Sequence, residues 1–96
     1  MTLRRAAKVD ANQAEVVEAL RKVGVQVEII GFPVDLLCCD QRGRLSLIEI
    51  KTEDGRLTKQ QVEFIQRWPG EVHIVRGPQE AVRAALGLAT DAQEPR

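Results

Sequence analysis

The chain lacks any long hydrophobic run. None of its apolar stretches approaches the roughly 20 residues that a membrane-spanning helix needs, so we expect no association with a membrane. The opening residues, MTLRRAAKVD, contain no apolar segment of the kind that forms the centre of a signal peptide. We therefore expect the protein to be cytoplasmic.

Cysteine is scarce as well. The chain has two, Cys38 and Cys39, and they are adjacent. On a strand, neighbouring side chains point to opposite faces of the sheet, so a disulfide between these two would strain the backbone. Their spacing matches no zinc-binding pattern. We interpret both as buried apolar residues.

Neither sign of charge is in excess. The 14 basic and 14 acidic residues cancel, which argues against a protein that binds nucleic acid non-specifically through its net charge. The balance still permits a nucleic-acid enzyme whose basic residues are local. Two basic clusters occur: an N-terminal arm over residues 1–9, with Arg4, Arg5 and Lys8, and a second cluster of Lys51, Arg56 and Lys59.

The length of 96 residues indicates one small domain with a thin core. We expect the domain to span residues 1–86 and the stretch 87–96, which has no hydrophobic period, to be a disordered tail. Hydrophobic periodicity and turn residues predict helices over 11–23, 59–68 and 78–86, and strands over 25–30, 34–40, 44–51 and 71–75.

Two of the predicted helices begin with a capping pattern. Asp10 and Thr58 are the expected N-caps, and each is followed three residues later by a glutamine, Gln13 or Gln61, as in a capping box. Gly24 supplies the expected end of the first helix.

The loop QRG sets the register of the second and third strands. A three-residue hairpin loop with glycine last suits a type I turn closed by a left-handed residue. If Asp40 faces Arg44, then Asp35 lies directly opposite Glu49, with the β-carbons about 5 Å apart. Lys51 shares that face. Both faces of these strands are otherwise largely apolar, so we expect helices on both sides of the sheet.

Two opposed carboxylates within a sheet repel each other, so a positive charge must hold them or one of them must be protonated. Their oxygens are the ligands that Mg²⁺ and Mn²⁺ prefer. A neighbouring lysine such as Lys51 could stabilise an anionic transition state or orient a water. This set of groups suits hydrolysis of phosphodiesters. The alternative is structural, a buried ion pair of Lys51 with Asp35 or Glu49.

The order of elements and the placing of Asp35 and of Glu49-Ile50-Lys51 resemble the PD-(D/E)XK nuclease superfamily. Within it, the chain most resembles small VRR-NUC-type and Holliday-junction-resolvase-like nucleases of phages and bacteria. Two further segments support the likeness: NQAEVVEAL, in which Glu15 matches an acidic residue, and LTKQQVEF, in which Gln61 matches a glutamine. Where the family usually has G-x-P-D-L, this chain reads GFPVDLL, with Val34 inserted before the aspartate.

The resemblance implies an α/β, restriction-endonuclease-like αβββαβ core, with a mixed central sheet, helices on both faces and a C-terminal helix. It implies an endonuclease that uses Mg²⁺ or Mn²⁺ to hydrolyse DNA phosphodiester bonds, with junctions and flaps among the expected substrates. The small surface favours a homodimer. The implied catalytic residues are Asp35, Glu49, Lys51, Glu15 and Gln61; the metal ligands are Asp35, Glu49, Glu15 and the Ile50 carbonyl; candidates for phosphate contacts are Arg4, Arg5, Lys8, Arg56 and Lys59.

Alternatives stay open for single residues and for the whole chain. An acid near a helix N-terminus, such as Glu15, also favours the helix dipole, and Gln61 is the capping partner of Thr58. The chain itself could be a nucleic-acid-binding module of the same fold without catalysis, or a small structural or protein-interaction domain with a buried ion pair.

Overall fold

The computed structural model describes residues 3–88, with side chains described from residue 12 onward. The elements are α1 (Leu3–Lys22), β1 (Gln26–Ile29), β2 (Leu36–Cys39), β3 (Leu45–Ile50), α2 (Lys59–Arg67), β4 (Val72–Val75) and α3 (Pro78–Leu86). This order confirms the predicted αβββαβ core followed by a C-terminal helix. Within the described part of the chain, no helix has the length and apolar character needed to cross a bilayer.

The four strands form one mixed sheet in the order β1-β2-β3-β4. β2 is antiparallel to both β1 and β3, whereas β4 runs parallel to β3 because α2 connects them as a crossover. The hairpin register is the predicted one, since Leu36 lies opposite Ile48. Gly43 closes the turn with a φ of 90°, and its N–H donates to the Asp40 carbonyl at 3.0 Å.

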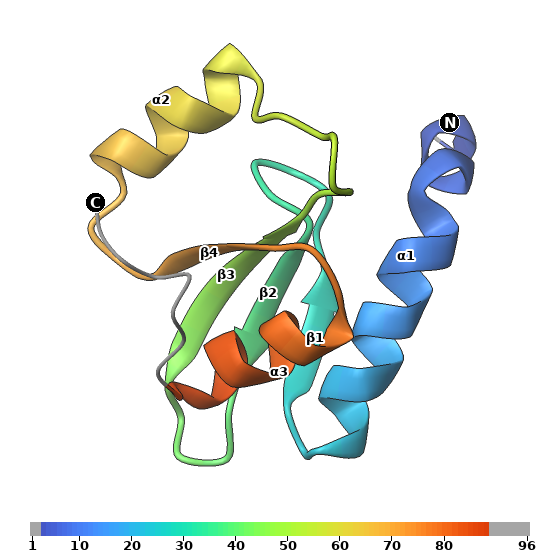
Figure 1. The fold of residues 1–96 in the computed structure, drawn as a ribbon. Helices are drawn as coiled ribbons and strands as arrows, with labels where there is room; N and C mark the ends of the chain where they lie inside the picture. Colours follow the sequence, from blue (N-terminus) through green and yellow to red (C-terminus); the bar gives the residue numbers. More distant parts are fainter. Residues whose placement is uncertain (1–2, 89–96) are drawn as a thin grey trace.

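Apolar side chains fill both faces of the sheet, as the strand pattern predicts. On one face Leu20 of α1 and Ala81 of α3 pack in a cluster with Leu36 and Ile48. On the other face a smaller cluster joins Phe64 of α2 to Leu47 and Val34. In Figure 1, α2 and α3 lie on opposite sides of β4. Each fully buried aliphatic side chain contributes about 1.5–3 kcal/mol, so the face under α1 and α3 provides most of the stability.

The hairpin end of the α2 face is less covered than predicted. Cys38 is buried, and burial raises the pKa of its thiol to about 11. Cys39, which we expected to be buried too, is only half-buried, and its cross-strand neighbour Leu45 is 60% exposed. The physical reason is the shortness of α2, which lies toward the opposite end of the sheet from the hairpin loop (Figure 1). Both cysteines are free.

The first helix is longer than predicted. It begins at Leu3 rather than at residue 11, so Asp10 lies inside α1 and the expectation that it caps the helix is wrong. The preceding residues include arginine, alanine and lysine, whose high helix propensity allows the helix to extend through them. The segment that we named the basic arm is therefore largely helical in its backbone, and its side chains lie outside the described part.

The end of α1 is the predicted one. Gly24 has a φ of 87°, its N–H donates to the Arg21 carbonyl at 3.0 Å, and the N–H of Val25 donates to the Leu20 carbonyl at 3.1 Å. This pair of bonds is a Schellman motif. At the other end of the chain, Gly87 ends α3 in a left-handed conformation. Most of the predicted tail, residues 89–96, lies outside the described residues.

Candidate functional site

Glu49 is the centre of the candidate site. Its side chain projects from β3 toward α2 and is only 4% exposed. One carboxylate oxygen, Oε2, lies 3.2 Å from Nζ of Lys51 and accepts a hydrogen bond of 2.9 Å from Nε2 of Gln61. The other oxygen, Oε1, is buried and has no hydrogen-bond partner. Glu49 therefore has one oxygen that is held by the protein and one that is not.

Asp35 lies beside Glu49, as the hairpin register predicts. It directly precedes β2, and the pairing of Leu36 with Ile48 places it across from Glu49. Its Oδ2 accepts a hydrogen bond of 2.8 Å from the main-chain N–H of Ile50. This bond fixes the Asp35 carboxylate at the end of β3.

The pKa of Glu49 is raised above its ordinary value. Burial is the largest cause, and the negative charge of Asp35 raises the pKa further. The hydrogen bond from Gln61 and the charge of Lys51 act in the opposite direction but do not cancel these two effects. The structure thus keeps a carboxylate where ionising it costs free energy.

Lys51 is placed on this face by the alternation of β3. It lies two positions after Glu49 along the strand, so both side chains lie on the same side of the sheet. Its main-chain N–H donates to the Val75 carbonyl at 2.9 Å, which extends the parallel pairing of β3 with β4 past Ile50. The Lys51 side chain is 18% exposed, so its ammonium group lies at the edge of the buried carboxylate.

Gln61 makes the predicted capping bonds and also contacts Glu49. Its N–H donates to Oγ1 of Thr58 at 3.1 Å and its Oε1 accepts from the Thr58 N–H at 3.0 Å, which completes the predicted capping box. Its Nε2 is the group that donates to Glu49. The capping role and the contact with the site do not exclude each other, because they use different atoms of one side chain.

Glu15 is not brought to these residues. It is exposed on α1, and within the described residues no hydrogen bond or ion pair joins it to Asp35 or Glu49. Among the described residues, no three His, Cys, Asp or Glu side chains are grouped so that they could hold a metal ion. Asp35 and Glu49 thus form a pair rather than a set of three with Glu15.

Two of the basic residues predicted to contact phosphates lie at the same end of the sheet as Glu49. Arg56 lies in the loop between β3 and α2, and Lys59 is the first residue of α2; both are exposed. α1 also begins at this end of the sheet (Figure 1). The side chains of Arg4, Arg5 and Lys8 in its first turns lie outside the described part.

Sequence reasoning missed Arg76, which supports the loop beside the site. Its Nη1 donates to the Thr52 carbonyl at 2.6 Å and to the Gly55 carbonyl at 3.3 Å. The parallel pairing of β3 and β4 could have indicated this contact, because the residue after β4 then lies at the same edge of the sheet as the loop after β3. No local pattern around Arg76 indicates this contact.

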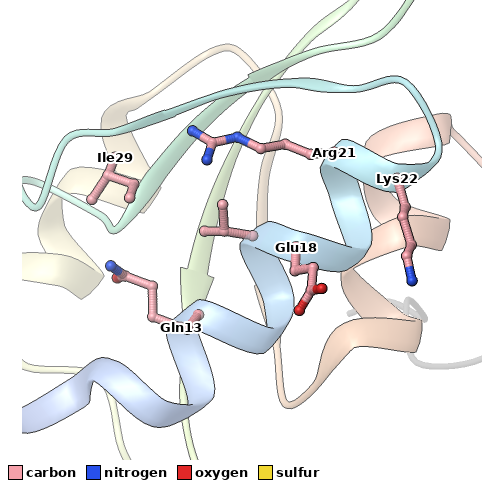
Figure 2. A pocket seen from close by; sticks show the side chains of 7 residues that line it. Gln13, Glu18, Arg21, Lys22 and Ile29 are labelled. Carbon is pink, nitrogen blue, oxygen red and sulfur yellow. The ribbon is translucent and has the colours of Figure 1, made fainter.

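An open pocket of about 770 Å³ lies elsewhere, between α1 and β1. Figure 2 shows Gln13 and Arg21 extending from α1 toward Ile29, while Glu18 and Lys22 point away from it. Arg21 also donates from Nη2 to the Val27 carbonyl at 3.2 Å, on the outer edge of the sheet. The pocket lining includes none of the residues gathered around Glu49.

Comparisons with known proteins add no family assignment. No family model, no curated protein and no solved structure matches this chain. The likeness to PD-(D/E)XK nucleases therefore depends on the motif residues and their spacing alone.

Proposed function

We propose that the protein is a Mg²⁺-dependent endonuclease that hydrolyses DNA phosphodiester bonds in the manner of PD-(D/E)XK nucleases. The observation that carries this proposal is the state of Glu49: a buried acid with a raised pKa and one oxygen without a partner. A buried unpartnered oxygen costs free energy. Perturbed, costly groups of this kind cluster at functional sites.

The donor atoms fit a small hard cation. Mg²⁺ is usually bound by one or two carboxylates and keeps several waters, which a pair such as Asp35 and Glu49 can satisfy. The N–H of Ile50 points toward Asp35, and the N–H and C=O of one strand residue point to the same side. The ligands would therefore be Asp35, Oε1 of Glu49 and the Ile50 carbonyl. Glu15, exposed on α1, would act through a water.

A divalent cation at this position, Mg²⁺ or Mn²⁺, would polarise the scissile phosphate and increase the acidity of a water. Lys51 pairs with Oε2 of Glu49. Its ammonium group would orient the attacking water or stabilise the negative charge that develops on the phosphate oxygens. Gln61 donates a hydrogen bond to the same oxygen, Oε2.

DNA is the proposed partner, and its phosphates would be bound by basic residues, of which Arg56 and Lys59 are exposed near the site. Such contacts position the substrate without reading its sequence. The radius of gyration of the Cα atoms is 12.8 Å, so one copy offers little surface to a junction or a duplex, and we propose a homodimer. A cytoplasmic location is part of the same proposal. The residues for phosphate contact are Arg4, Arg5, Lys8, Arg56 and Lys59.

The test is a cleavage assay on a panel of labelled DNA structures: junctions, flaps, single strands and plain duplexes. We expect cleavage with Mg²⁺ or Mn²⁺, none with EDTA, and none by Asp35→Ala, Glu49→Ala or Lys51→Ala, with circular dichroism showing that each variant is folded. Loss of a group that acts in the transition state removes several powers of ten in rate. Metal-dependent cleavage by Glu49→Ala at the wild-type rate would exclude Glu49 from the site.

A further inference from the structure

Three hydrogen bonds connect the start of α2 to Glu49. Oγ1 of Thr58 accepts from the Gln61 N–H at 3.1 Å, Oε1 of Gln61 accepts from the Thr58 N–H at 3.0 Å, and Nε2 of Gln61 donates to Oε2 of Glu49 at 2.9 Å. Among the described residues, no hydrogen bond joins Thr58 to Glu49 or Asp35, so its hydrogen bonds can affect the site only through Gln61.

The bond from the Thr58 N–H determines which way the Gln61 amide faces. Its oxygen is taken by the Thr58 N–H, so its NH₂ group must be the end that faces Glu49. A flipped amide would lose the capping bond and place an oxygen against the Glu49 carboxylate. The bond from the Gln61 N–H to the Thr58 hydroxyl holds the backbone of the same residue.

The third bond then determines which oxygen of Glu49 is free. Oε2 is satisfied by Gln61 and Lys51, and Oε1 is left buried without a partner. We propose that Thr58 is a positioning residue: through Gln61 it holds the Glu49 carboxylate so that Oε1 is presented to a divalent cation. This inference rests on the metal site of the proposed function, and it adds a residue that the motif resemblance does not include.

If Thr58 has a purely structural role, a different result is expected. As an N-cap it would only stabilise α2, so another substitution that destabilises α2 would affect the site as much as loss of the Thr58 hydroxyl does. Gln66 provides the matched control, since it is exposed on the same helix and, in the described part of the chain, no hydrogen bond links it to Glu49. Gln66→Gly weakens the helix and leaves all three hydrogen bonds in place.

The experiment measures the affinity of the full chain for Mn²⁺ by isothermal titration calorimetry. Loss of a group that orients a metal ligand typically weakens metal binding about 10- to 100-fold. We expect Gln61→Met, which keeps the Thr58 hydroxyl on the helix backbone, to fall in that range and Thr58→Val to lose about 10-fold. Thr58→Ser, which restores the hydroxyl, and Gln66→Gly should bind Mn²⁺ as the wild type does.

The outcomes separate this inference from the proposed function. If the wild type binds Mn²⁺ and Thr58→Val binds it equally well, Thr58 has no positioning role. The same conclusion follows if Gln66→Gly loses as much affinity as Thr58→Val. If the wild type binds no Mn²⁺, the metal site itself is wrong and the inference falls with it. Gln61→Met tests the link to Glu49 independently, should Thr58→Val fail to fold.

Discussion

At the scale of single residues, the candidate site depends on the burial and hydrogen bonding of one carboxylate, that of Glu49. Glu49 is buried beside a second acid, yet the protein supplies a lysine and an amide to only one of its oxygens. A well-packed apolar residue at this position would avoid the cost of burying a charge. That a destabilising group is kept here is the pattern expected when function competes with stability.

The raised pKa of Glu49 predicts how stability depends on pH. Burial first, and then the charge of Asp35, makes the folded protein hold the Glu49 proton more tightly than the unfolded chain does. The contribution of this group to stability is therefore full below the ordinary glutamate pKa of 4.5 and is lost as the pH rises through the raised value. Glu49→Gln removes the ionisation, so we expect its stability relative to the wild type to increase between about pH 4 and about pH 7.

Urea unfolding of both proteins at the two pH values, without metal, measures this difference. The comparison is internal, since ionisable groups distant from Glu49 contribute equally to the stability of the wild type and of the variant. A difference in the free energy of unfolding that stays constant or shrinks toward neutral pH would contradict the raised pKa and, with it, the account of Glu49 as a costly ionised group.

At the scale of elements, the β2–β3 hairpin positions the site. The turn fixes a register in which Asp35 and Glu49 lie opposite each other, and Asp40 supports it: Oδ1 accepts from the N–H groups of Arg42 and Arg44, each at 2.9 Å. Both bonds lower the pKa of Asp40, and the bond from the Arg44 N–H has the larger effect. The geometry of the candidate site at one end of the strands is thus determined by a turn at the other end.

Gly43 provides the test of this hairpin. Its φ of 90° is unfavourable for residues with a β-carbon, and an added Cβ would meet nothing within 4 Å, so the cost is that of the backbone alone. We expect Gly43→Ala to lower the free energy of unfolding by about 1–2 kcal/mol. Gly43→Asn should lose less, because asparagine tolerates the left-handed region better. Urea unfolding measures both, and an alanine variant as stable as the wild type would show that the turn does not need this conformation.

The hairpin and α1 show how far local sequence determines an element. The register follows from three loop residues and the alternation of the strands, so sequence alone predicts the apposition of Asp35 and Glu49. The start of α1 does not follow, because Asp10 and Gln13 form a capping pattern that the helix-forming residues before them override. The contact of Gln61 with Glu49 was predictable, since the position of Gln61 on the apolar side of its helix directs it toward the sheet.

At the scale of the whole molecule, contacts between distant segments complete the site. Two hydrogen bonds depend on how strands and loops meet at one edge of the sheet. One runs from the Ile50 N–H to Asp35, and the other from the Arg76 guanidinium to the Thr52 carbonyl. No periodicity or spacing indicates either contact. The position of Glu15, exposed on α1, is likewise set by packing, which is why a motif match could not decide whether it joins the site.

The central claim, that Asp35 and Glu49 together hold a divalent cation, is tested most directly by X-ray diffraction from a crystal soaked in Mn²⁺. Anomalous scattering identifies the metal without reference to activity. The account predicts an anomalous peak between the Asp35 carboxylate and Oε1 of Glu49, absent from crystals of Glu49→Gln. A wild-type crystal with no peak at this position, or a peak that persists in Glu49→Gln, would contradict it.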